Sequence, residues 1–254
     1  MPKFLTQHQI SLFERDGFLS PLNILSTEEA MSAKLELEEA ERKWPSEFSG
    51  SARNNAHLVF TFLDKIVHNE KLLNAIEDLI GENILAYATV LFIKEAHDPG
   101  FVSWHQDGKY MGLDQDIGVT AWVALSEANE VSGCMSMIPG SHKEMKEHVD
   151  KYEENNILTR GQEVEGVDAS KAALVPLQPG QCSLHCPTII HGSKPNISDS
   201  RRIGFAIQTY MPTSVKQTLG RTSAQLVRGI DNYNNFDLLP RPKHNLQPYQ
   251  VDLR

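Results

Sequence analysis

The sequence predicts a mainly β fold, a sandwich or jelly roll, with helices flanking it. From residue 84 to residue 210, short β-branched and aromatic runs alternate with Gly, Pro, Asn and Asp, a pattern typical of many short strands joined by turns. Before residue 84 the apolar residues recur at helical spacing instead. The length of 254 residues suits one large β-rich domain or two small ones, and we predict a single domain over 1–254.

Three helices are predicted in the first third of the chain. Thr6–Gln9 and Ser26–Glu29 have the spacing of capping boxes, in which two side chains and two backbone amides bond reciprocally. The helices that they open extend to Phe13 and to Trp44, and a proline directly after Trp44 ends the second. A third helix over 70–80 has its leucines and isoleucines on one side and stops before a glycine.

Seven strands are predicted after these helices. They cover residues 84–93, 101–107, 119–125, 135–138, 181–185, 188–191 and 203–210. The segment 142–171 is long, acidic and unpatterned, and such insertions in compact domains are usually lids or disordered loops. We therefore divide the domain into a helical buttress at 1–83, a jelly-roll core at 84–212 that contains this lid-like insertion, and a C-terminal tail at 213–254.

Composition narrows the class of partner. The net charge of -9 and the pI near 5.6 argue against nucleic acid and anionic membranes, which attract basic proteins, and favour a small-molecule substrate. Three cysteines are too few for a disulfide framework and indicate a reducing compartment. The amino-terminal residues lack the pattern of a secretory signal, and no stretch reaches the ~18 to 20 apolar residues of a membrane helix. From these three observations we expect a cytoplasmic protein.

A candidate metal site begins with Trp104-His105-Gln106-Asp107. Two residues apart on a strand, His105 and Asp107 point to the same face, so an imidazole and a carboxylate can converge on one ion. His191 would complete a 2-His-1-carboxylate triad. Such a triad leaves one side of an octahedral iron open, as non-heme Fe(II) oxygenases need for a co-substrate and dioxygen. An arginine follows His191, and its planar fork suits bidentate capture of a carboxylate, which iron alone would not require.

Two alternatives compete with this reading. His185 lies in the same apolar stretch as His191, but Pro187 argues against one continuous strand that carries both. His185 then either supports the metal ligands or is a core histidine with satisfied hydrogen bonds, and we expect the latter. A zinc site formed by Cys182, His185, Cys186 and His191 lacks the usual CxxC spacing.

Six motifs occur together between residues 84 and 210. They are Phe92-Ile93-Lys94, Trp104-His105-Gln106-Asp107, Thr120-Ala121-Trp122, Gly133-Cys134-Met135, Ile138-Pro139-Gly140-Ser141-His142 and His191-Gly192-Ser193. In this combination the stretch closely resembles the phytanoyl-CoA dioxygenase (PhyH) family of Fe(II)/2-oxoglutarate-dependent oxygenases, whereas the helical start and the tail match only in outline. The resemblance implies a double-stranded β-helix of the jelly-roll, cupin-like type, with helices against one sheet.

Residue by residue, the resemblance implies the following roles. The Fe(II) ligands are His105, Asp107 and His191. The distal carboxylate of 2-oxoglutarate is held by Arg202 and Ser193, and Lys94 is a further co-substrate contact. Arg201 competes with Arg202, but Arg202 has the family spacing of 11 from His191, and strand neighbours face opposite ways.

The implied reaction consumes 2-oxoglutarate and O2, releases succinate and CO2, and hydroxylates an unactivated C–H bond. The acidic insertion offers no cluster of Lys and Arg for acyl-CoA phosphates. We therefore expect a small polar or zwitterionic metabolite, such as an amino acid or the aminophosphonate 2-aminoethylphosphonate. Candidate pocket or substrate contacts are Trp122, Thr120, Lys109, Tyr110, Asn55 and His57. Trp122 is equally well explained as a core residue, and the others as ordinary polar side chains.

Two other classes of function are weighed against this one. A metal-binding jelly-roll hydrolase or isomerase would not use 2-oxoglutarate, and would need neither Arg202 nor Lys94. A catalytically silent binding module is disfavoured because all three candidate ligands are present.

Overall fold

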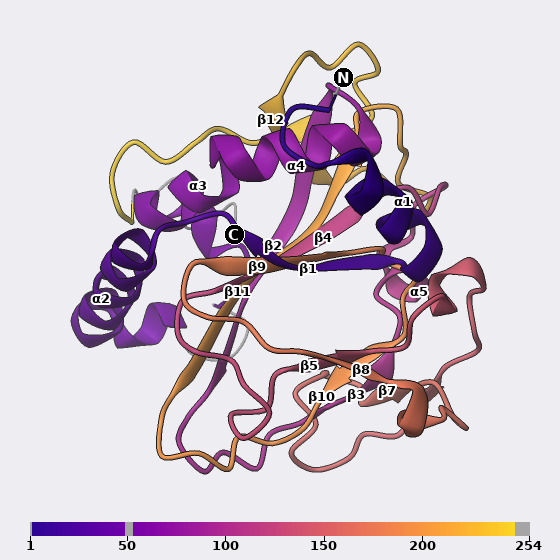
Figure 1. The fold of residues 1–254 in the computed structure, drawn as a ribbon. Helices are drawn as coiled ribbons and strands as arrows, with labels where there is room; N and C mark the ends of the chain where they lie inside the picture. The colour runs from indigo at the N-terminus through magenta and orange to yellow at the C-terminus, as the bar shows by residue number, and fades with distance from the viewer. Residues whose placement is uncertain (1, 49–52, 247–254) are drawn as a thin grey trace.

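The computed structural model describes residues 2–48 and 53–246, so residues 247–254 of the predicted tail lie outside the described residues. Two β-sheets face each other, and helices lie along the outer face of the larger one (Figure 1). This is the expected jelly-roll arrangement. The division into buttress, core, insertion and tail stays a prediction.

The larger sheet has seven strands. In spatial order they are β1 (Phe18–Asn23), β9 (Gln181–His185), β4 (Val119–Ala124), β11 (Arg202–Pro212), β2 (Ile84–Lys94), β12 (Ser223–Arg228) and β13 (Asp237–Leu238). The smaller sheet contains β3 (Val102–His105), β10 (His191–Ser193), β5 (Met135–Met137) and β8 (Ala173–Val175), and a separate pair contains β6 (Val149–Asp150) and β7 (Gln162–Glu163). Neighbouring strands in the two main sheets are antiparallel, except that β12 and β13 are parallel.

The first, second and fourth helices confirm the local signals of the sequence, whereas the third and fifth were not predicted. They are α1 (Gln7–Asp16), α2 (Thr27–Lys43), α3 (Thr61–Val67), α4 (Glu70–Ile80) and α5 (Gly108–Met111), with short 3-10 turns η1 (Pro45–Phe48), η3 (Ala56–Leu58), η4 (Ser141–Lys143) and η5 (Ala169–Lys171). Both capping boxes form, at Thr6–Gln9 and at Ser26–Glu29. Among the described residues, no helix combines the length and apolarity needed to cross a lipid bilayer.

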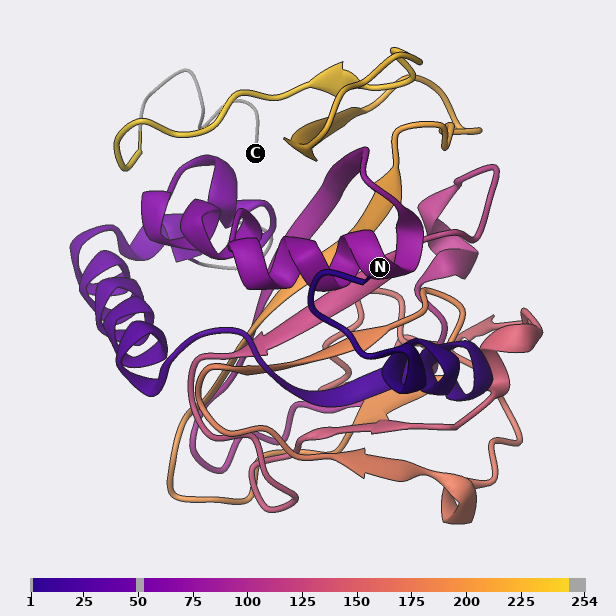
Figure 2. The ribbon, with the colours of Figure 1, turned by 45° about the horizontal axis from the view of Figure 1, so that its top comes forward.

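The main hydrophobic core lies between the helices and the larger sheet. Apolar side chains of α2, α3 and α4 pack there against one face of β2, β4, β9 and β11. Figure 2 shows α4 running across that face. A smaller apolar cluster, which includes Trp122, Met137 and Ala206, fills part of the space between the two sheets. The inner faces of the sheets are thus left to form the candidate site.

Several elements differ from the sequence-based expectation. β1 lies in the stretch expected to be a helical buttress, and β12 in the expected tail. The strand pattern of β1 is hidden by Pro21, which is tolerated because β1 is an edge strand. β10 begins at His191, where the predicted strand ends. The insertion 142–171 contains β6 and β7, and its Val164 backbone N–H donates to the carbonyl of Trp104 in β3.

Tyr210 connects the larger sheet to the helices, and its removal should weaken the fold. Its buried hydroxyl donates a hydrogen bond of 2.8 Å to the backbone oxygen of Val67 at the end of α3. We expect Tyr210→Phe to lower the free energy of unfolding by about 1 kcal/mol, because the buried carbonyl loses its donor. Urea denaturation measures this, with exposed Tyr233→Phe as the control that should not change. Equal stability of the two variants would contradict the role of this bond.

Candidate metal centre

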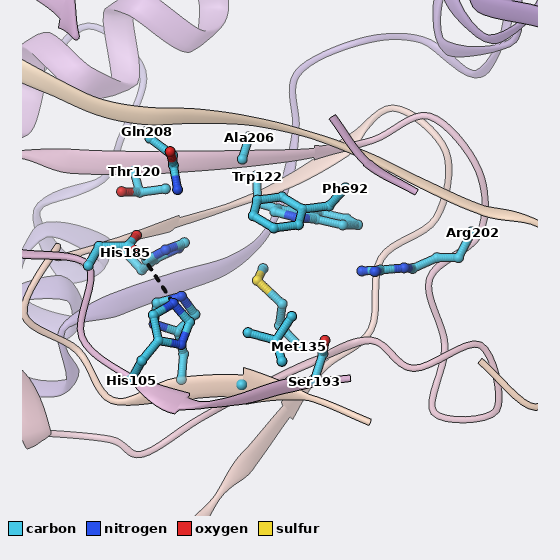
Figure 3. Close-up of a pocket in the computed structure, with 14 residues that line it drawn as sticks. Phe92, His105, Thr120, Trp122, Met135, His185, Ser193, Arg202, Ala206 and Gln208 are labelled. Carbon is cyan, nitrogen blue, oxygen red and sulfur yellow. Dashed lines mark ion pairs between the residues drawn. The ribbon is translucent and has the colours of Figure 1, made fainter. Parts of the chain in front are cut away.

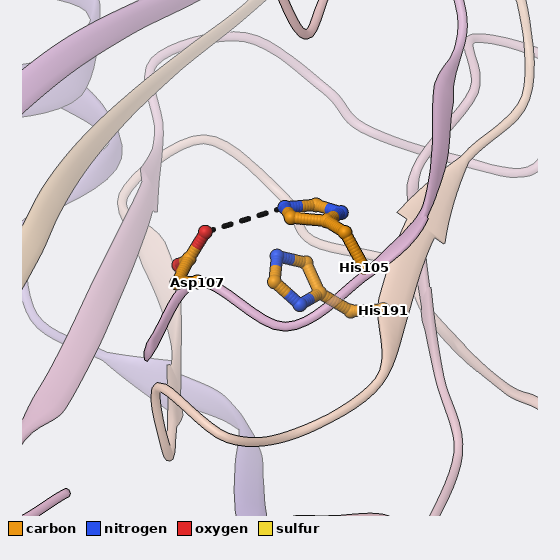
Figure 4. Close-up of side chains that lie close together, drawn as sticks. All are labelled: His105, Asp107 and His191. Carbon is orange, nitrogen blue, oxygen red and sulfur yellow. Dashed lines mark ion pairs between the residues drawn. The ribbon is translucent and has the colours of Figure 1, made fainter. Parts of the chain in front are cut away.

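The three predicted metal ligands come together at one end of the smaller sheet. His105 is the last residue of β3, His191 is the first residue of β10, and the register of these adjacent strands places the two residues opposite each other. Asp107 follows in the turn before α5. One potential ligand atom from each residue lies within 4.8 Å of the other two, and the His105 Nε2 atom is 3.2 Å from Asp107 Oδ1 (Figure 4).

Backbone hydrogen bonds orient both imidazole rings. The Nδ1 atom of His105 lies 2.9 Å from the carbonyl oxygen of Ser103, and that of His191 lies 3.1 Å from the carbonyl oxygen of Ile189. A carbonyl oxygen can only accept, so each Nδ1 carries a proton, and Nε2 is the ring nitrogen left to face the site. Metal-binding histidines in proteins are commonly oriented in this way.

Electrostatics favours the protonation states that a metal needs. Burial, together with the neighbouring His105, lowers the pKa of His191 to about 3, so its ring is neutral at neutral pH. Burial alone would raise the pKa of the Asp107 carboxyl, but the hydrogen bond from His105 and the nearby His191 outweigh it and keep that pKa well below its ordinary range. A carboxylate and a neutral imidazole are both ready to bind a cation without first losing a proton.

A small cavity extends from these ligands between the two sheets. In Figure 3, His105 and His185 lie near one end and Arg202 lies at the other. The side chains of Phe92, Trp122 and Met135 line the stretch between the two ends. The cavity therefore has a metal-binding end and a cationic end separated by an apolar passage.

The cationic end is lined by Arg202, and Lys94 lies beside it behind Ser193; neither buried side chain has a carboxylate partner among the described residues. Arg202 is 1% exposed, and its Nε and Nη2 atoms have no hydrogen-bond partner among the described residues. Lys94 is opposite Arg202 in the β2–β11 register, and its Nζ donates to the Ser193 Oγ at 2.8 Å and to the Lys194 carbonyl. Two buried cations without a counter-ion are costly. This end of the cavity is therefore suited to a carboxylate ligand.

The structure separates the two neighbouring arginines. Arg201 points away from the cavity and forms ion pairs with Glu41 at 2.7 Å and with Glu95 at 2.8 Å. Arg202 lines the cavity, and its guanidinium lies 5.3 Å from the centre of the Trp122 ring. Of the two arginines, only Arg202 is available to a ligand in the cavity.

The other predicted contacts are divided between the cavity and its surroundings. Thr120 and Trp122 line the cavity. Trp122 also belongs to the apolar cluster between the sheets, so it is both a pocket residue and a core residue. Lys109 and Tyr110 lie on α5, directly after Asp107, but are outside the cavity lining. Lys109 instead forms an ion pair with Glu147 of the insertion.

Asn55 and His57 are not brought to this cavity. Both belong to the wall of a separate pocket beside β2 and β12. The Asn55 side chain accepts a bond from the Thr89 backbone N–H, and the His57 Nδ1 lies 2.8 Å from the Thr89 hydroxyl oxygen. These bonds fix the segment along β2, which sequence spacing could not reveal.

The structure contradicts the expectation that His185 is a satisfied core histidine, and it adds Gln208, which was not among the predicted site residues. His185 lines the cavity, and neither of its ring nitrogens has a hydrogen-bond partner among the described residues, so it is not a satisfied core histidine. Burial lowers its pKa to about 4. The zinc set is not assembled, because Cys182 faces the main core. Gln208 lines the cavity, and the alternation of β11 from Arg202 could have predicted this.

Comparisons with known proteins agree with this geometry. The family model described as phytanoyl-CoA dioxygenase (PhyH) matches residues 13–204. A probable alpha-ketoglutarate-dependent hypophosphite dioxygenase of Stutzerimonas stutzeri is 32% identical over 207 residues, which are 78% of this chain and 67% of the relative. The non-heme monooxygenase ThoJ in its apo form superposes with a TM-score of 0.86 at 33% identity, covering 96% of this chain and 92% of the other. CytC3 with Fe(II) and alpha-ketoglutarate shares the fold, with a TM-score of 0.71 at 22% identity over 92% of this chain and 93% of the other.

Lys94 should make stability depend on pH in a defined direction. Burial, and then the Arg202 guanidinium, lower the pKa of Lys94 from its ordinary 10.5 to about 7. Above the lower value the unfolded chain binds more protons than the folded protein, so rising pH stabilises the fold through this amine. We expect the free energy of unfolding of Lys94→Met to rise less than that of the wild type between about pH 7 and about pH 9.

Urea denaturation at several pH values, without 2-oxoglutarate, measures the effect. Exposed Lys71→Met serves as the control that should keep the wild-type slope. Parallel profiles for the wild type and Lys94→Met would contradict a buried amine with a lowered pKa.

Proposed function

The chain belongs to the phytanoyl-CoA dioxygenase family of Fe(II)- and 2-oxoglutarate-dependent dioxygenases, and on this premise we propose that it hydroxylates an unactivated C–H bond of a small polar metabolite. Succinate and CO2 are the products of the co-substrate. One observation carries the proposal: a possible metal-binding triad lies at one end of a cavity, and the buried Arg202 guanidinium, with two unpartnered nitrogens, lies at the other end beside the buried Lys94.

The donor set fits a ferrous ion. Under this proposal His105, Asp107 and His191 hold Fe(II) from one side, in the arrangement that leaves the other side open. The bound iron supplies the activation of dioxygen that is coupled to decarboxylation of the keto acid. The protein keeps both rings oriented through their Nδ1 hydrogen bonds and keeps the carboxyl group ionised.

The co-substrate spans the cavity in this proposal. Its keto acid end lies at the metal, and Arg202, Ser193 and Lys94 bind its distal carboxylate. The guanidinium can form two parallel hydrogen bonds to that group. Phe92, Trp122 and Met135 exclude water from the stretch between, which strengthens these electrostatic interactions. A hydrolase or isomerase that does not use 2-oxoglutarate would have no need for this cationic end.

The substrate is proposed to be an amino acid or a small phosphorus compound such as 2-aminoethylphosphonate. A relative that is 32% identical is named as a hypophosphite dioxygenase, which supports the phosphorus class. The space between the two sheets is small and must accommodate substrate and keto acid together, which favours a small molecule. All three cysteines are free thiols, and the cytoplasmic location stays a prediction.

Removal of a ligand tests the metal centre. We expect His105→Ala and Asp107→Ala each to reduce Fe(II)-dependent succinate formation by more than about 100-fold. Loss of a residue that only hydrogen-bonds to a metal ligand typically costs up to about 100-fold, and loss of the ligand itself should cost more. Asp116→Ala is the matched control, since this exposed carboxylate is outside the cavity lining. Circular dichroism checks that the variants remain folded. Undiminished turnover in either ligand variant would refute the assignment.

The adjacent arginines provide a matched test of the co-substrate site. Arg202→Ala should raise the KM for 2-oxoglutarate by about 10- to 100-fold, because a buried charge-assisted interaction is lost. Arg201→Ala removes the same charge from a side chain that is paired outside the cavity, and should leave this KM unchanged. Steady-state assays of succinate measure both. Equal effects of the two substitutions would point to a general charge effect instead of a binding site.

A further inference from the structure

Three polar side chains form a row across the larger sheet at the metal-binding end of the cavity. His185 of β9 is the direct cross-strand partner of Thr120 of β4, so both point to the same face of the sheet. Gln208 of the next strand, β11, lines the same cavity. Figure 3 shows His185, Thr120 and Gln208 gathered at this end, away from Arg202. We call these three residues the polar row.

The polar row has hydrogen-bonding capacity that the protein itself does not use. His185 is 1% exposed, and both of its ring nitrogens are without partners among the described residues. No hydrogen bond of the Gln208 side chain forms within the described part of the chain. The Thr120 hydroxyl has one long contact, at 3.4 Å, with that of Thr209. Buried polar atoms are nearly always satisfied, so those of His185 in particular require a ligand.

A local distortion of β11 places these groups. The β11–β4 register shifts between Ile207 and Tyr210, which marks a bulge. Within it Thr209 has a φ of 69°, a left-handed conformation that is unfavourable for a β-branched residue. Bulges redirect side chains next to binding sites, and strained backbone is concentrated at such sites. The bulge brings the Thr209 hydroxyl beside Thr120 at the same end.

The chemistry of the polar row indicates the kind of group it binds. An imidazole, an amide and two hydroxyls together offer several hydrogen-bond donors. Arg202 is the only lysine or arginine among the described residues that line the cavity, and it stands at the opposite end, six residues before Gln208 on β11. Such donors next to a metal cation suit the oxygens of a compact, singly charged oxyacid.

We infer that His185 and Gln208 bind an oxyacid group of the primary substrate, a carboxylate or a phosphorus oxyanion, and so determine substrate specificity. This inference rests on the proposed function. It assigns the two ends of the cavity to different molecules, with the keto acid anchored at Arg202 and the substrate anchored at the polar row.

Calorimetry under anaerobic conditions tests the inference on the enzyme loaded with Fe(II) and 2-oxoglutarate. Hypophosphite, 2-aminoethylphosphonate and glycine are the probes, and we expect the wild type to bind at least one. His185→Phe keeps the ring but removes both nitrogens, and Gln208→Leu keeps the approximate shape without the amide. Each should raise the Kd of the bound probe at least about 10-fold, as expected for loss of a hydrogen bond to a charged group.

Two further substitutions separate binding from a structural role. Gln208→Glu preserves the shape of the side chain but adds a negative charge. It should therefore weaken binding of an oxyanion more than Gln208→Leu does. Ser183→Ala is the matched control on β9, since its hydroxyl is also buried and unpaired but is outside the cavity lining. Iron content and the Kd of 2-oxoglutarate should stay at wild-type values in the two His185 and Ser183 variants and in both Gln208 variants.

The outcomes are distinct. Binding of hypophosphite or 2-aminoethylphosphonate alone supports a phosphorus oxyanion, and binding of glycine alone supports a carboxylate. If none of the probes binds to a wild-type enzyme that converts 2-oxoglutarate to succinate, the inference is overturned while the proposed reaction class stands. Unchanged probe affinity in His185→Phe and Gln208→Leu, or loss of iron from His185→Phe, also overturns it. A wild type that binds a probe but forms no succinate would overturn the proposed function alone.

Discussion

The pairing of β10 with β3 is the constraint on which the candidate site depends. His191 lies opposite His105 because these short strands are held in register, and β10 is further fixed by its pairing with β5. A shift of one residue would turn His191 to the other face of the sheet. The ring orientations then follow from local bonds, since each Nδ1 reaches a carbonyl two residues earlier in the chain. The geometry is therefore set by backbone hydrogen bonds before any ion is bound.

Stability and function are assigned to different layers of the molecule. The helices and the outer face of the larger sheet enclose the main apolar core, whereas the inner faces carry the buried polar groups. Arg202 and Lys94 have no counter-ion, and His185 has no hydrogen-bond partner among the described residues, so this layer costs stability in the ligand-free protein. The larger core can offset that cost. Binding of an anionic co-substrate should remove part of it.

The long strand β11 links both ends of the cavity. It carries Arg202 at one end and Gln208 near the other, on a face that β4 and β9 extend with Thr120 and His185. A rigid strand fixes the distance between the two groups more reliably than a loop could. In the proposed function this spacing orders the keto acid, the metal and the substrate along one line. Apolar side chains between the ends keep water out of that line.

Patterns that depend on neighbours in the chain could be predicted from the sequence. They include both capping boxes, helix α4, most strands of the core, and the proximity of His105 and Asp107. His191 lies far along the chain, and its addition to this pair rested on the combination of motifs and the family resemblance. The tertiary structure alone decided that β1 and β12 join the larger sheet, that the loop with Asn55 lies along β2, and that His185 faces the cavity. These features depend on which strands become neighbours and in what register. Pairings between distant segments are set by packing of the whole core, and periodicity within one segment does not encode them.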